Sequence, residues 1–146
     1  MPSVHASAVL VGARAALIRG PSGAGKSQLA LALLHAAERG LLPFAMLVAD
    51  DRSHLEPRHG RLLVRPAGEL AGLIEVHGLG IRRVPYEPVA VVGLVVDLAA
   101  ADAARLPTSA AEQVTIEGVA LARLAVAAGA DPLPLVRAAL TTGPHR

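Results

Sequence analysis

The sequence predicts a single α/β domain that spans residues 1–146 and contains many short strands but few helices. Three observations support this fold class. A chain of 146 residues has the length of one domain. Its apolar residues fall mostly in short runs that are typical of strands, and few segments show helical spacing. A glycine-rich loop stands between a predicted strand and the first predicted helix, an arrangement found at the phosphate-binding sites of α/β domains.

The individual elements follow from local residue patterns. Apolar runs at residues 7–11 and 14–19, joined by Gly12 and Ala13, predict a hairpin or two consecutive strands. Residues 26–39 have helical spacing and are followed by Gly40, a typical helix stop. Short helices are also predicted at residues 98–106 and 132–141. The remaining short apolar runs predict strands at residues 44–49, 62–65, 73–76, 89–96, 114–116 and 119–124.

Composition excludes several classes of function. The chain has no cysteine, which excludes disulfides, thiolate zinc sites and cysteine nucleophiles. Aromatic residues make up 1% of the chain, and the arginines behind its net charge of +2 are scattered, so we expect no nucleic-acid partner. The apolar runs are shorter than the roughly 18–20 residues of a spanning helix, and the N-terminus has no basic signal-peptide region. We therefore expect a cytoplasmic protein that does not bind membranes.

The glycine-rich loop contains the single lysine of a chain with thirteen arginines. Its sequence, Gly20-Pro21-Ser22-Gly23-Ala24-Gly25-Lys26-Ser27, matches the P-loop pattern G-x-x-x-x-G-K-[ST] at every defined position. Glycines allow successive backbone N–H groups to surround an anion, and the following helix adds its dipole. The lysine supplies a positive charge to the outer phosphates, and the serine hydroxyl can bind Mg²⁺. The loop therefore predicts binding of a nucleoside triphosphate or a related polyphosphate.

A phosphate-binding loop of this type needs an acidic partner at the end of a neighbouring strand, and the sequence offers two candidates. Asp50 follows the strand predicted at 44–49, and Asp97 follows the stronger strand pattern at 91–96. Asp97 also suits the N-cap of the helix predicted at 98–106. Asp50 is followed by Asp51, and because adjacent strand residues point to opposite sides, only one of this pair should face the phosphates. The pattern favours Asp50 and leaves Asp97 open.

Two further residues are candidates on pattern alone. Glu75 stands at an alternating position of a short strand, just before the loop Gly78-Leu79-Gly80. This position suits a metal ligand, and it suits a solvent-facing strand residue equally well. His5 precedes the first strand, where a single histidine is more often a surface residue than a functional one.

Taken together, these motifs resemble the catalytic domain of the HPr kinase/phosphorylase family. The resemblance covers about residues 5–97 and rests on four elements in the family's order: His5 before a strand pair, the loop at residues 20–27, the acidic strand end Leu47-Val48-Ala49-Asp50-Asp51, and the signature loop Ile74-Glu75-Val76-His77-Gly78-Leu79-Gly80-Ile81. It implies a P-loop kinase domain with a mixed, strand-rich sheet, similar to the HPr kinase C-terminal domain and to PEP carboxykinase. It also implies an ATP- and Mg²⁺-dependent kinase that phosphorylates a serine of HPr or an HPr-like phosphocarrier.

The resemblance assigns roles residue by residue. His5, Lys26 and Asp50 would be catalytic, with Asp50 taking the proton of the serine hydroxyl and returning it when phosphoserine undergoes phosphorolysis. Ser27 and Glu75 would hold Mg²⁺. The phosphates of ATP would be bound by Gly20, Pro21, Ser22, Gly23, Ala24, Gly25, Lys26 and Ser27.

The sequence also departs from the family's pattern. His77 stands where the family usually has arginine, and no residue matches the family's downstream catalytic arginine, for which Arg123 is a poor substitute. The family's N-terminal domain has no counterpart in these residues. Kinase activity is therefore better supported than the reverse reaction, in a homo-oligomer whose contacts can differ from the family's. Two alternatives are a nucleotide-binding regulatory module and a small-molecule P-loop kinase, although the arginine-rich lid of the latter is missing.

Overall fold

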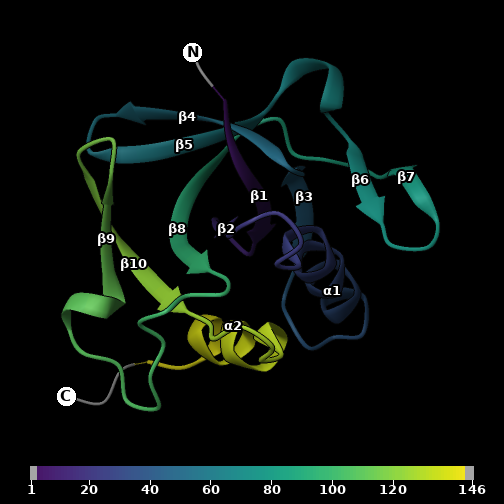
Figure 1. Cartoon of the computed structure of the whole chain (residues 1–146). Helices are drawn as coiled ribbons and strands as arrows, with labels where there is room; N and C mark the ends of the chain where they lie inside the picture. The colour runs from purple at the N-terminus through teal and green to yellow at the C-terminus, as the bar shows by residue number, and fades with distance from the viewer. Residues whose placement is uncertain (1–2, 144–146) are drawn as a thin grey trace.

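The computed structural model describes residues 3–143, which form one strand-rich domain (Figure 1). Its two α-helices are α1 (Lys26–Glu38) and α2 (Pro132–Thr141), and single 3-10 turns occur at η1 (Gly68–Leu70) and η2 (Ala110–Glu112). The strands are β1 (Ser3–Val11), β2 (Arg14–Arg19), β3 (Ala45–Ala49), β4 (Arg52–Arg58), β5 (Arg61–Pro66), β6 (Leu73–Val76), β7 (Gly80–Arg83), β8 (Ala90–Asp97), β9 (Gln113–Ile116) and β10 (Val119–Ala125).

Five of the strands close into a barrel. The strand order β2-β1-β4-β5-β8 is completed by a further pairing between β8 and β2. The β2–β8 contact is parallel and the other four are antiparallel, so the barrel is mixed. Outside the barrel, β3 pairs with β1, and β10 and β9 extend the sheet from β8. Strands β6 and β7 form a separate hairpin that projects beside α1 (Figure 1).

The predicted α/β class, a P-loop kinase domain with a mixed, strand-rich sheet, is therefore wrong, because five strands close into a barrel and only two α-helices accompany them in residues 3–143. The reason lies in strands β1 and β2, which are buried on both faces. Ala6, Ala8 and Leu17 belong to one core cluster, whereas Val9 and Ile18 belong to another that packs against α1. Strands buried on both sides have nearly continuous apolar runs, as strands of a helix-flanked parallel sheet do. Here a closed barrel, rather than a second layer of helices, covers the other face.

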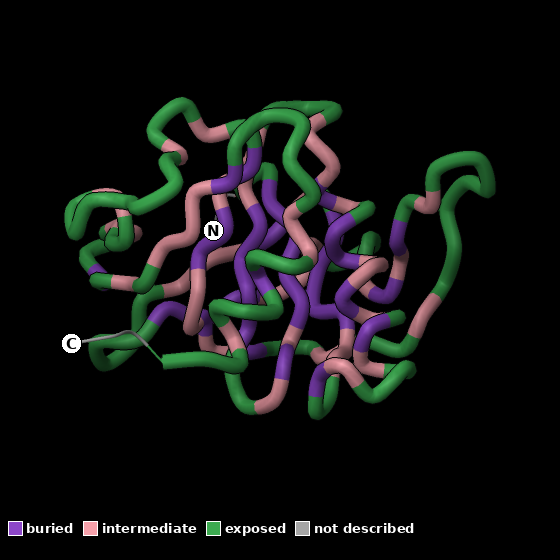
Figure 2. Tube along the Cα trace, turned by 90° about the horizontal axis from the view of Figure 1, so that it is seen from below, coloured by how far each residue is buried: buried purple, intermediate pink, exposed green. Residues whose placement is uncertain are grey.

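The residues in the centre of the domain are more deeply buried than those at its edges. Figure 2 shows the buried segments concentrated in the central strands, while most of the connecting loops are exposed. In the projecting hairpin, Ile74 of β6 is buried. All four residues of β7 are exposed. Among residues 3–143, no helix is long and apolar enough to span a membrane.

Most predicted elements are present, and the exceptions have physical explanations. The hairpin at residues 7–19, helix α1, the β9–β10 hairpin and helix α2 are confirmed. Strand β4 was not predicted because its sequence, Arg-Ser-His-Leu-Glu-Pro-Arg, is mostly polar, and pairing with β1 and β5 holds it in place. The helix predicted at residues 98–106 is wrong. There the backbone N–H groups of Leu98 and Ala100 donate to Arg19 and Val126 of neighbouring segments instead of forming a helix.

Closure of the barrel depends on Gly93. In the β2–β8 ladder Ala15 is opposite Val92 and Ala16 is opposite Leu94, so Gly93 is the extra residue of a bulge. A Cβ atom at Gly93 would lie 2.7 Å from the Cβ of Arg14, closer than packed side chains allow. Small residues are required where two strands approach this closely.

We expect Gly93→Ala to lower the free energy of unfolding by about 1–3 kcal/mol, because the added methyl group must push β2 and β8 apart. Urea denaturation measures the effect. Gly68→Ala is the matched control, since a Cβ atom there meets nothing within 4 Å. Equal stability of the two variants would show that the bulge has room for a side chain.

Candidate functional site

The glycine-rich loop connects the end of β2 to the start of α1. Gly25, at the N-cap of α1, has a φ of 100°, a conformation that other residues adopt only with strain. The N–H of Ala24 donates to the carbonyl oxygen of Pro21, and the N–H of Leu29 donates to that of Gly25, so the loop turns tightly into the helix. This geometry leaves the N-terminus of α1 facing the loop, as anion binding requires.

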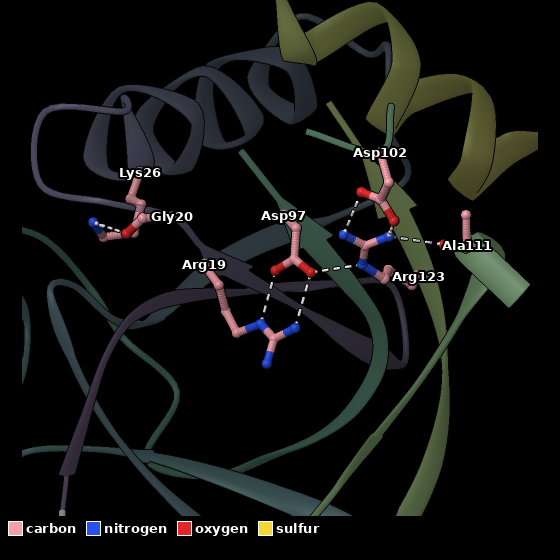
Figure 3. A network of polar contacts seen from close by, with 7 residues as sticks. All are labelled: Arg19, Gly20, Lys26, Asp97, Asp102, Ala111 and Arg123. Carbon is pink, nitrogen blue, oxygen red and sulfur yellow. Dashed lines mark hydrogen bonds and ion pairs between the residues drawn. The ribbon is translucent and has the colours of Figure 1, made fainter. Parts of the chain in front are cut away.

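Lys26 lies almost buried beneath this loop, with 8% of its surface exposed. Its Nζ donates to the carbonyl oxygen of Gly20 at 2.9 Å (Figure 3) and to that of Pro21 at 3.2 Å. The ammonium group is thus held by neutral acceptors of its own loop. A phosphate oxygen that entered the loop would be a stronger, charged acceptor for the same group.

Asp50 is buried where four elements meet. Its carboxylate accepts hydrogen bonds from Ser7 Oγ at 2.8 Å, from Ser27 Oγ at 2.7 and 2.8 Å, and from the backbone N–H of Glu75 at 3.0 Å. Only 6% of the residue is exposed. Because both oxygens are engaged by β1, α1 and β6, Asp50 fixes the position of the Ser27 hydroxyl rather than facing open solvent.

A polar cavity of about 770 Å³ opens beside the loop. It collects side chains from β1, α1, the end of β3 and the β6–β7 hairpin, although these elements are distant in the sequence. Besides residues 20–23 and 25 of the loop, the residues that line it are His5, Lys26, Ser27, Gln28, Asp51, Glu75 and His77. The structure therefore brings together the predicted residues His5, Lys26, Ser27 and Glu75.

Asp51 is the residue that sequence reasoning did not assign to the site. It lines the polar cavity, whereas Asp50 does not. Its side chain is 65% exposed, and its Oδ1 lies 4.0 Å from Nδ1 of His5. The rule that adjacent strand residues point to opposite sides already indicates that only one of Asp50 and Asp51 can face the cavity. Which of the two faces the cavity was not predictable, because Asp51 has a φ of 65° and so departs from the strand geometry on which that rule depends.

Asp97 has a different role from the predicted N-cap. It accepts hydrogen bonds from Arg19 at 2.8 and 2.9 Å and from Arg123 Nε at 2.7 Å, while Arg123 also donates to Asp102 and to the carbonyl oxygen of Ala111 (Figure 3). These contacts join the ends of the parallel strands β2, β8 and β10. Arg123 is 13% exposed and fully engaged, so it offers no free guanidinium to the polar cavity.

The charge of Asp97 contributes to stability. Burial would raise the pKa of this carboxyl, but the hydrogen bonds and charges of Arg19 and Arg123 outweigh burial and hold the pKa below its usual value. A lowered pKa in the folded state stabilises the fold above the unfolded pKa of about 3.9, and this contribution is lost as the pH falls through the folded pKa.

We expect Asp97→Asn to lower the free energy of unfolding at pH 7 by about 1–3 kcal/mol, since two guanidinium groups lose a charged acceptor. The difference from the native protein should shrink below about pH 4. Urea denaturation at pH 7 and pH 3 measures both effects, with the exposed Glu112→Gln as control. A difference that stays constant with pH would contradict an electrostatic role.

The oxygen atoms that line the polar cavity suit Mg²⁺, which takes part of its ligands from phosphate groups. They suit less well a metal whose ligands all come from the protein. Among residues 3–143 no group of three or more His, Asp or Glu side chains is arranged as a metal cluster. Mg²⁺ in kinase sites is bound through one or two protein oxygens together with phosphate oxygens. The Ser27 hydroxyl and the Glu75 carboxylate line one cavity next to the loop, so these residues fit that ion.

Comparison with known proteins agrees with this geometry at the level of the fold. The solved structure of the HPr(Ser) kinase/phosphatase from Coxiella burnetii matches with a TM-score of 0.75, and the match covers 96% of this chain and 94% of that one. The chain has the fold of an HPr(Ser) kinase/phosphatase. Sequence identity to that protein is 22%, so the likeness shows the fold alone. No family model and no curated protein sequence matches the chain.

Proposed function

We propose that the protein is a Mg²⁺-dependent kinase that transfers the γ-phosphoryl group of ATP to a serine hydroxyl of HPr or an HPr-like phosphocarrier. The observation that carries this proposal is the polar cavity, which collects His5, Lys26, Ser27, Asp51 and Glu75 from four separate parts of the chain. The fold shared with an HPr(Ser) kinase/phosphatase supports the choice of protein substrate.

The glycine-rich loop and Lys26 would bind the phosphates of ATP. The loop offers backbone N–H groups and the N-terminus of α1, and the Lys26 ammonium would exchange the carbonyl oxygens of Gly20 and Pro21 for phosphate oxygens. Because the ammonium is already held at the loop, little reorganisation accompanies this exchange. Positioning and charge neutralisation are the main contributions that phosphoryl transfer needs from a protein.

Ser27 and Glu75 are the residues that would hold Mg²⁺. When bound, the ion would supply positive charge that neutralises the charge developing on the phosphates during transfer. Asp50 orients Ser27 by accepting a hydrogen bond from the Ser27 hydroxyl, so that the lone pairs of Oγ face the cavity. Asp50 therefore acts by positioning in this proposal.

Geometry favours Asp51 as the group that accepts the proton of the serine hydroxyl. A general base needs a free lone pair within reach of the substrate, and the Asp51 side chain is exposed in the cavity whereas both oxygens of Asp50 are engaged. The hydroxyl proton would move to Asp51 as the serine oxygen bonds to the γ-phosphorus and the bond to ADP breaks. His5, at 4.0 Å, would keep Asp51 oriented. The assignment of this role to Asp50 from sequence stays a competing prediction.

The test is to incubate the protein with Mg²⁺, γ-labelled ATP and HPr. We expect label in HPr as acid-stable phosphoserine, and none in an HPr variant whose acceptor serine is replaced by alanine. Nucleotide binding without transfer would instead indicate a regulatory module. Transfer to a small metabolite but not to HPr would indicate a small-molecule kinase. Cytoplasmic location and homo-oligomer formation stay predictions.

A further inference from the structure

Ser7 is a buried serine of β1 that has no role in the mechanism proposed above. None of its surface is exposed, yet its hydroxyl contacts two residues of the candidate site. Ser7 Oγ donates to Asp50 Oδ1 at 2.8 Å and accepts a hydrogen bond from the backbone N–H of Asp51 at 3.2 Å. A hydroxyl can donate one hydrogen bond and accept others, so this one group holds both consecutive carboxylate residues.

Asp50 and Asp51 form the two-residue connection between β3 and β4, and both of these strands pair with β1. The backbone N–H of Arg52 donates to the carbonyl oxygen of Asp50 at 2.7 Å, which closes a three-residue γ-turn around Asp51. At its centre Asp51 has a φ of 65°. A γ-turn with positive φ is rare and strained in a residue other than glycine.

A strained turn of this kind persists only where neighbouring groups hold it in place. Strand β1 supplies two such groups. The backbone N–H of Ala6 donates to the carbonyl oxygen of Asp51 at 3.1 Å, and Ser7 Oγ accepts from the N–H of the same residue. The turn in turn exposes the Asp51 side chain at the polar cavity, beside His5. The conformation of Asp51 that the cavity requires is therefore fixed in part by a buried hydroxyl.

We infer that Ser7 is a positioning residue for phosphoryl transfer, because its hydroxyl holds the turn that places the Asp51 carboxylate at the polar cavity. The inference rests on the proposed function, in which Asp51 accepts the proton of the substrate serine. A general base must stay within hydrogen-bond reach of that proton, and a displacement of about 1 Å can slow a reaction about 10²-fold. Asp50 keeps its hydrogen bonds from Ser27 and from the Glu75 N–H without Ser7, so loss of the hydroxyl should release Asp51 first.

Hydrogen exchange at the Asp51 amide tests the positioning without any activity assay. Ser7→Ala removes the acceptor of this amide, so we expect the amide to exchange about tenfold faster, as measured by NMR. Ser53→Ala is the matched control. Ser53 is equally buried, but its Oγ donates to the carbonyl oxygen of Ala6 rather than contacting the turn. The Asp51 amide of Ser53→Ala should exchange as slowly as that of the native protein.

Single-turnover transfer to HPr at saturating ATP tests the role in the reaction. Ser7→Ala should slow transfer by about ten- to hundredfold and leave ATP affinity unchanged, since the phosphates are assigned to the glycine-rich loop. Ser7→Thr keeps the hydroxyl and should recover most of the rate, and Ser53→Ala should react at the native rate. In the background of Asp51→Asn, Ser7→Ala should slow transfer by less than about twofold further, because the two residues act on the same step.

Thermal melting identifies the folded variants. If Ser7→Ala does not fold, Ser7→Cys, which replaces the hydroxyl by a weakly hydrogen-bonding thiol, takes its place. Normal amide exchange and normal transfer in the variant, or an equal loss of rate with and without the Asp51 carboxylate, would show that Ser7 only stabilises the fold, and only this inference would be wrong. If the native protein transfers no phosphoryl group to HPr, the proposed function is wrong and this inference fails with it.

Discussion

Replacing Lys26 with alanine should slow phosphoryl transfer by at least about 10²–10³-fold, the usual effect of removing one preorganised charge from a transfer site. The variant loses the positive charge that would face the phosphates. It also loses the hydrogen bonds that Lys26 Nζ donates to the carbonyl oxygens of Gly20 and Pro21. Affinity for ATP should fall as well. Labelled-phosphate transfer and calorimetry measure the two effects.

Two further variants test whether the effect comes from the positive charge of Lys26 alone or from its compact ammonium group at this position. Lys26→Arg keeps a positive charge but replaces a compact ammonium by a planar group, so we expect it to recover little of the lost rate. Arg39→Ala removes an exposed charge beyond the end of α1 and should change neither rate nor affinity. Unchanged ATP affinity in Lys26→Ala would show that the loop does not bind the phosphates. Loss of the folded state in this variant would show that Lys26 has a structural role.

Asp51→Asn should slow transfer by at least about 10²-fold, which is the usual contribution of a positioned general base. Nucleotide affinity should change little, since Asp51 lies outside the glycine-rich loop to which the proposed function assigns the phosphates. Single-turnover transfer with saturating ATP isolates the chemical step. Glu117→Gln, at an exposed turn between β9 and β10, is the control.

Asp50→Asn should give a different result. An amide cannot accept all the hydrogen bonds that Ser7, Ser27 and the Glu75 N–H donate to the Asp50 carboxylate, so stability should fall by about 1–3 kcal/mol. The Mg²⁺ concentration at half-maximal rate should rise, because Ser27 is no longer oriented. If Asp50→Asn abolishes transfer while Asp51→Asn retains it, the base is Asp50, as the sequence favoured.

The sequence predicted the local features of this site better than the architecture around it. The loop and the helix after it follow from short-range patterns of residue type and spacing, whereas His5 and Glu75 were assigned to the site through the family resemblance. Closure of the barrel does not follow from such patterns, because it depends on β2 pairing with β8, a strand that is distant from β2 in the sequence. Likewise the partners of Asp97 could not be predicted, since Arg19 and Arg123 come from strands whose neighbourhood only the tertiary structure decides.

The same long-range pairing has a consequence for folding kinetics. Strand β2 forms a hairpin with its immediate neighbour β1, but Arg19 and Asp97, which join β2 to β8, are 78 residues apart in the chain. Contacts between distant residues form late, because a long segment must first lose its freedom. The hairpin and α1 can therefore form early, whereas Leu98 reaches Gly20 only after β8 docks. We therefore expect the glycine-rich loop to acquire its final support only when the barrel closes, so that ATP binding, which the proposed function assigns to this loop, appears with the same rate constant as closure.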